Sequence, residues 1–68
     1  MTPEEVETWL GRIREHAANG DNEAAHAAED DMRGFVLDAI ANGAAAYPAH
    51  LARLALTSKD IKFTRWYA

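Results

Sequence analysis

The sequence predicts an all-α fold: an antiparallel helical hairpin, a shorter third helix and an aromatic C-terminal turn. Apolar residues recur at spacings of three and four through residues 3–42, which is typical of amphipathic helices. Breaks near Gly20 and Gly43 divide this pattern, and no segment alternates apolar and polar residues over the length of a strand. With 68 residues, the chain is expected to form a single small helical domain, residues 1–68.

The first helix is predicted to begin at Pro3, because proline suits the first helical position. Thr2 can cap it, and Glu5 completes the Thr-x-x-Glu pattern of a capping box. The turn residues at 19–21 are expected to end the helix. Its apolar stripe consists of Val6, Trp9, Leu10, Ile13 and Ala17.

The second helix is expected to run from about Asn22 to Asn42, with Asp21 or Asn22 as its N-cap. Gly43 suits the position after its last turn, since glycine accepts the left-handed conformation. The short connection before this helix makes the first two helices an antiparallel hairpin. The inward stripe comprises Ala25, Ala28, Met32, Phe35, Val36, Ala39 and Ile40.

A third helix is predicted from about Pro48 to Leu56, after a connector at 44–47. Pro48 is expected to hold Tyr47 in extended geometry. Short turns are then expected, one capped by Thr57 or Ser58 and containing Ile61, and a last one capped by Thr64. The last turn would hold Trp66 and Tyr67.

The last six residues hold three of the six aromatic side chains. Chain ends are usually polar and frayed unless packing holds them, so this segment closes the core or contacts a partner. We expect Ile61 and Phe63 to close the core beside Trp9 and Phe35. The predicted core is Trp9, Met32, Phe35, Ile40, Leu51, Leu54, Ile61 and Phe63. The residues expected to reach a second chain are Arg65, Trp66 and Tyr67.

The net charge of −4 is unevenly distributed: residues 1–43 carry a balance of −7 and residues 44–68 a balance of +3. The two parts should attract each other, within a monomer or between subunits. Because a core of this size is marginal, self-association would reinforce it, and we expect a homo-oligomer.

The second helix also has a face of small and acidic residues opposite its apolar stripe. Gly34 should cost this helix about 1 kcal/mol relative to alanine. Such a face permits close approach of another helix or subunit, and the alternative is a tolerated surface glycine. The interface residues predicted on this face are Asp31, Gly34 and Asp38.

A Glu-x-x-His motif on the second helix is the strongest candidate metal site. Glu23 and His26 lie one turn apart, Asp30 follows, and carboxylate-bridged di-iron bundles use two such motifs, which a homodimer would supply. The motif lies beside the apolar stripe, however, so the site would be open to water. The spacings His26–Asp30 and Glu29–Arg33 also fit ordinary intrahelical pairs. The sequence implies no other cofactor.

Several function classes are poorly supported. No hydroxyl side chain lies in a nucleophile-elbow context, and the isolated glycines form no phosphate loop, so we expect no enzymatic activity. The absence of cysteine excludes disulfides and thiolate zinc sites. The first residues lack the basic and apolar regions of a secretory signal, so a cytoplasmic protein without a membrane partner is expected.

Nucleic-acid binding is an alternative function for the basic, aromatic C-terminal segment. Trp66 and Tyr67 could stack on bases between its cations. The sequence pI of about 5.1 lacks the basic footprint of such a domain, which makes nucleic acid an unlikely partner. The cations are Arg53, Lys59, Lys62 and Arg65.

The chain ends in Ile-x-Phe-x-Arg-Trp-Tyr-Ala, from Ile61 to Ala68. From about residue 23 to this ending it resembles small uncharacterised helical proteins of actinobacteria and their phages, whereas the first helix is unmatched. The resemblance implies a small accessory protein, phage-encoded and acting on a host component, and carries over no catalytic residue. We therefore expect a non-enzymatic protein that acts by protein–protein interaction with a host protein.

Overall fold

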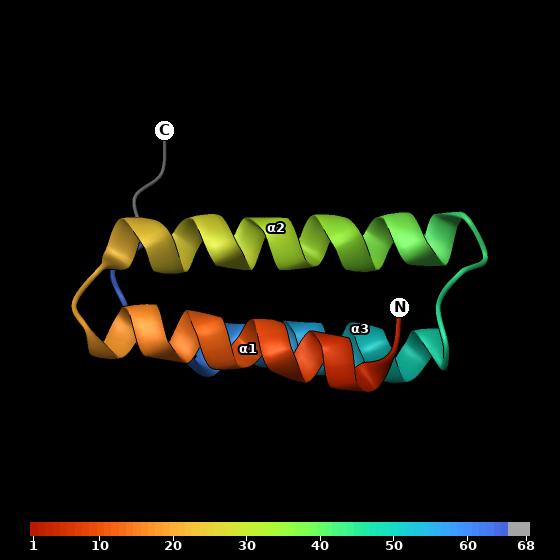
Figure 1. The fold of residues 1–68 in the computed structure, drawn as a ribbon, viewed down its shortest axis with the longest axis horizontal. Coiled ribbons are helices and arrows are strands. Elements are labelled where there is room, and N and C mark those ends of the chain that lie inside the picture. Colours follow the sequence, from red (N-terminus) through yellow and green to blue (C-terminus); the bar gives the residue numbers. More distant parts are fainter. Residues whose placement is uncertain (66–68) are drawn as a thin grey trace.

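The computed structural model describes residues 1–65. Its helices are α1 (Pro3–Ala18), α2 (Asn22–Ala41) and α3 (Pro48–Leu56), followed by the 3-10 turn η1 (Thr57–Asp60). No strand occurs in this part of the chain. The structure confirms the predicted all-α fold, in which α1 and α2 form a hairpin and the shorter α3 packs beside them (Figure 1).

The predicted caps form at the starts of α1 and α2. The Thr2 hydroxyl accepts the Glu5 N–H at 3.3 Å, and the Glu5 carboxylate accepts the Thr2 N–H at 3.2 Å, which completes the capping box. At α2, the Asp21 carboxylate accepts the Ala24 N–H at 3.0 Å. Local sequence signals therefore place both helix starts correctly.

The connector between α2 and α3 contains two left-handed residues. Gly43 has φ +70°, as its position after α2 predicts. The predicted extended geometry at Tyr47 is wrong, since this residue has φ +55° and ψ +63°. The chain reverses direction between Ala41 and Pro48, and the second left-handed residue completes that reversal directly before α3.

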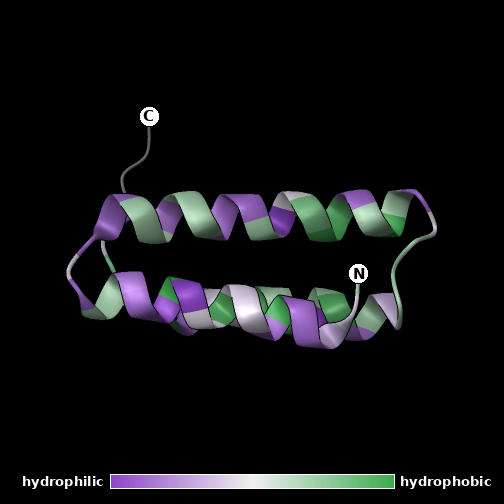
Figure 2. Ribbon diagram, viewed as in Figure 1, coloured by the Kyte–Doolittle hydropathy of each residue, from purple (hydrophilic) through white to green (hydrophobic). Residues whose placement is uncertain are grey.

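The core lies where the three helices meet. Hydrophobic and hydrophilic residues alternate in bands along α1 and α2, as expected for amphipathic helices (Figure 2). The buried apolar residues are Val6, Leu10, Ile13, Ala25, Ala28, Met32, Val36, Leu51 and Ala55. Partly buried apolar residues that pack against them include Trp9, Leu54, Ile61 and Phe63.

Two expected core residues lie at the surface. Phe35 is 51% exposed and Ile40 is 37% exposed. The ring centroid of Phe35 lies 5.6 Å from that of Trp9, at the junction of α2 with α1. Ile40 lies at the opposite edge of the apolar stripe of α2, toward α3. The apolar stripe of α2 is wider than the surface its two neighbours cover, so both edges of the stripe remain open.

The C-terminal segment packs at a different end of the core from the one predicted. Ile61 and Phe63 contact the core as expected. The Thr64 N–H, however, donates to Asn22 Oδ1 at 3.3 Å, at the start of α2. At 1.5 Å per residue, this is about 20 Å along the helix from Phe35. Because α3 and η1 run back along α2, they deliver the tail to the turn between α1 and α2.

Candidate functional site

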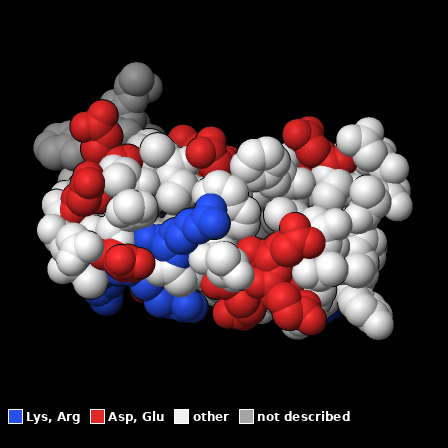
Figure 3. All heavy atoms as spheres, viewed as in Figure 1, with Lys and Arg blue, Asp and Glu red and all other residues white. Residues whose placement is uncertain are grey.

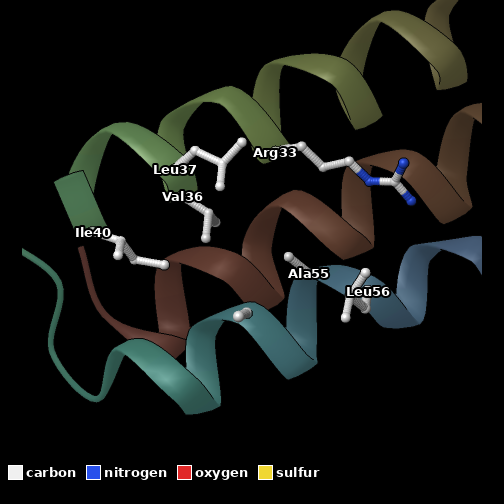
Figure 4. A pocket seen from close by; sticks show the side chains of 7 residues that line it. Arg33, Val36, Leu37, Ile40, Ala55 and Leu56 are labelled. Atoms are coloured by element: carbon white, nitrogen blue, oxygen red, sulfur yellow. The ribbon is translucent and has the colours of Figure 1, made fainter.

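An open apolar groove of about 260 Å³ lies between α2 and α3. The close view in Figure 4 shows side chains from both helices around it. Val36 and Ala55, which belong to the core, form its floor. Leu37 and Leu56, which are 66% and 57% exposed, form its upper edges. The remaining lining residues are Arg33, Ile40 and Ala52.

The groove follows from helical spacing and from one small side chain. On α2, Arg33, Leu37 and Ile40 follow one another at spacings of four and three, so they share a face. On α3, Ala52 and Leu56 share a face for the same reason. Ala52 has only a methyl group as its side chain, which leaves the space between the two faces open. Apolar side chains gathered around an open groove favour a binding surface.

Exposed charges of opposite sign lie on α2 and on α3 with η1, outside the groove. Moving round α2 away from the groove, Leu37 is followed by Gly34 and then by the exposed carboxylates of Asp31 and Asp38. Figure 3 shows acidic side chains spaced along the edge of the molecule that α2 forms. On α3 and η1, the exposed cations are Arg53 and Lys59. The α2 wall of the groove itself carries a cation, Arg33, whereas Asp31 and Asp38 lie on the far side of α2.

The structure brings the three interface residues predicted on α2 onto one exposed face. Asp31, Gly34 and Asp38 are all exposed. Apart from its chain neighbours and the backbone of its own helix, no atom of the described residues lies within 4 Å of the position that a Cβ would occupy at Gly34, so this face has room for a partner. The interface assignment of these residues stays a prediction.

A buried ion pair that the sequence did not predict joins α2 to the C-terminal segment. Glu29 is only 2% exposed. Arg65 donates to it through two bonds, from Nε to Oε1 at 2.9 Å and from Nη2 to Oε2 at 2.8 Å. Arg33 Nη2 lies 3.6 Å from Glu29 Oε2 and donates to Ser58 Oγ at 3.0 Å. The spacing Glu29–Arg33 indicated only an ordinary surface pair, and nothing local marked the pairing with Arg65.

Arg65 also organises the chain after η1. Its Nη2 donates to the carbonyl oxygens of Ser58 at 3.0 Å and Ile61 at 3.3 Å, and its Nη1 to that of Phe63 at 3.4 Å. Its Cζ lies 3.8 Å from the ring centroid of Phe63. Its guanidinium is thus engaged within the chain, while its predicted interface role stays a prediction. The other two tail residues expected at an interface, Trp66 and Tyr67, lie outside the described residues.

The surroundings of Glu29 favour its charged form. Burial alone would raise the pKa of this carboxyl group. Hydrogen bonds from Arg65 and Ser58, together with the positive charges of Arg33 and Arg65, outweigh burial, and the pKa lies below its ordinary value. Glu29 is therefore a structural anion at neutral pH.

The expected metal ligands are not assembled within one chain. His26 Nε2 lies 3.5 Å from Asp30 Oδ2, as the spacing of an intrahelical pair predicts. Glu23 lies exposed in the first turn of α2. Among residues 1–65, no three His, Cys, Asp or Glu side chains are grouped so that they could hold a metal ion. A site shared between two chains stays a prediction.

Comparisons with protein-family models, with curated proteins and with solved structures gave no match for this chain. The resemblance to proteins of actinobacteria and their phages therefore stays a prediction. Within the described part of the chain, no helix has both the length and the apolar character needed to cross a bilayer.

Proposed function

We propose that this chain is a small accessory protein without a reaction of its own, and that it binds another protein through the groove between α2 and α3. The observation that carries this proposal is the exposure of Leu37 and Leu56 on either side of an apolar floor. Large apolar side chains that surround a hollow are typical of surfaces that pack against a partner.

The shape of the groove favours a helical partner. The antiparallel helices α2 and α3 form its two walls. A helix of the partner, laid between these walls, would bury its own apolar stripe on Val36 and Ala55. This is the helix-in-groove mode, in which anchors three and four residues apart enter the hollow. The resemblance of the chain from about residue 23 onward to small proteins of actinobacteria and their phages supports a host component as the cellular target.

One observation favours protein binding over nucleic-acid binding. Arg65, the cation closest to the aromatic pair of the tail, donates hydrogen bonds to Glu29 and to backbone carbonyls. Its engagement there weakens the case for a phosphate contact at this residue.

Site-specific photo-crosslinking in the cell that makes the protein tests the proposal. A benzophenone side chain replaces Leu37 in the groove, and the matched control carries it at Glu15, on the exposed surface of α1. We expect protein adducts from position 37 and none above background from position 15. Equal or absent adducts at the two positions would contradict the proposed function.

A further inference from the structure

We infer that the segment of the partner protein bound in the groove is an amphipathic helix that carries a carboxylate in line with its apolar stripe, and that this carboxylate pairs with Arg33. This inference rests on the proposed function, because it uses the same groove and adds the chemistry of the occupant.

Two cations lie at the edges of the groove. Arg33 lines its α2 wall, and the side chain of this residue is 42% exposed. Arg53 is exposed and lies three positions before Leu56, so it is the neighbour of that groove residue on the surface of α3. Among the described residues that line the groove, none is acidic. The groove therefore favours an occupant with negative charge over one with positive charge.

The charge of Arg33 is only partly compensated within the chain. Glu29 accepts two hydrogen bonds shorter than 3 Å from Arg65, at 2.9 and 2.8 Å, whereas Arg33 Nη2 lies 3.6 Å from Glu29 Oε2. Arg33 Nη2 donates to Ser58 Oγ, and the buried Nε has no hydrogen-bond partner among residues 1–65. Two guanidinium groups thus share one buried carboxylate, which leaves positive charge at Arg33 available to a ligand.

The exposed carboxylates near this end of the groove do not take up that charge. Asp30 precedes Arg33 by three positions on α2, and its Oδ2 lies 3.5 Å from His26 Nε2. Asp60 lies at the end of η1 and does not line the groove. Within the described residues, no ion pair joins either carboxylate to Arg33. A carboxylate of the partner therefore meets no competing anion in the groove lining.

The length of the groove sets the place of the carboxylate on the partner helix. Figure 4 shows Arg33 and Ile40 at opposite ends of the α2 wall. They are seven positions apart, which corresponds to about 10 Å along the helix. A partner helix laid along α2 covers this distance with about seven of its own residues. Apolar side chains at its positions i and i+4 then pack between Ile40 and Val36, and a carboxylate at i+7 lies opposite Arg33.

Titration of the purified full chain with two synthetic helical peptides tests this inference. One peptide has leucine at i and i+4 and glutamate at i−3 and i+7, so that either direction along the groove presents a carboxylate to Arg33. The other has glutamine at both outer positions, and the same hydrocarbon staple holds both peptides helical. We expect NMR shifts of the Val36 and Leu37 methyl groups, and about tenfold tighter binding of the glutamate peptide at low salt.

Arg33→Gln and its matched control, Arg14→Gln on the exposed surface of α1, separate this pairing from general charge attraction. Arg33→Gln should remove most of the preference for the glutamate peptide, and Arg14→Gln should leave it unchanged. Circular dichroism checks that both variants fold, and the comparison of the two peptides on the wild type does not depend on either. Equal affinities for the wild type, no binding of either peptide, or a preference that persists in folded Arg33→Gln would overturn the inference.

Photo-crosslinking from position 37 distinguishes failure of this inference from failure of the proposed function. Protein adducts from that position, together with equal affinities of the two peptides, would leave the proposed function standing and remove the inference. The absence of adducts would remove both.

Discussion

At the scale of single residues, the most consequential contact is the ion pair between Glu29 and Arg65. A domain of this size has a total stability of about 3–10 kcal/mol, at 0.05–0.15 kcal/mol per residue. Removing one member of a buried pair costs about 3–5 kcal/mol, because the other charge stays buried without compensation. Glu29 is almost fully buried, whereas the Arg65 side chain is 20% exposed, which favours the lower end of that range.

We therefore predict that Glu29→Gln lowers the free energy of unfolding by about 3 kcal/mol, measured by urea denaturation at neutral pH. Glu15→Gln, on the exposed surface of α1, should change it by less than about 0.5 kcal/mol. Replacing both members of the pair with methionine should recover part of the loss, because no charge then stays buried alone. Equal stability of Glu29→Gln and the wild type would show that the ion pair contributes nothing.

The lowered pKa of Glu29 gives a second prediction. The unfolded chain takes up a proton near the ordinary glutamate pKa of about 4.3, whereas the folded chain does so only at lower pH. The stabilising contribution of Glu29 is thus complete above that value and is lost as the pH falls through the lowered pKa. Urea denaturation across this acidic range should show a steeper loss of stability in the wild type than in Glu29→Gln. Parallel pH profiles would contradict the assignment.

The sequence could not reveal this pair, although both residues were visible in it. The partners are 36 positions apart, and only the return of α3 along α2 brings them together. The neighbouring cation Arg33 offered a sufficient local explanation for the Glu29 carboxylate. Side-chain burial at one position of a helix depends on what lies across from it, which spacing alone does not encode.

At the scale of elements, the ends of the helices could be predicted from the sequence, whereas the burial of residues at the edges of the apolar stripes could not. Thr2, Asp21 and Gly43 act through hydrogen bonds and backbone angles within a few residues, so their signals are local. Phe35 and Ile40 share the spacing of the buried residues, yet their exposure depends on how much of α2 its neighbours cover. The groove at Ile40 could not have been found in the sequence for this reason.

The C-terminal segment provides the prediction at this scale. Truncation after Asp60 removes Ile61 and Phe63 from the core and Arg65 from Glu29. We expect the free energy of unfolding of the truncated chain to be lower by at least about 3 kcal/mol. Circular dichroism should then show that thermal unfolding is no longer cooperative.

Combining the truncation with Glu29→Gln separates lost packing from the lost ion pair. Once Arg65 is absent, Glu29 keeps only the longer contact with Arg33 and its neighbour Ser58, so glutamine at position 29 should destabilise the truncated chain much less than the full one. A truncated chain that unfolds like the full one would show that the segment does not hold the core together.

At the scale of the whole molecule, the uneven charge of the sequence is divided between an internal ion pair and the exposed surface. The fold uses one attraction internally, between Glu29 and Arg65. It leaves Asp31 and Asp38 exposed on α2, and Arg53 and Lys59 exposed on α3 and η1. The sequence predicted attraction within a monomer or between subunits, and only the positions of the helices separate the residues available for each.

The proposed binding of another protein in the groove between α2 and α3 is tested most directly by photo-crosslinking from position 37. The account predicts protein adducts from a benzophenone side chain at this position and none above background from the control position Glu15, on the exposed surface of α1. Equal or absent adducts at the two positions would contradict it.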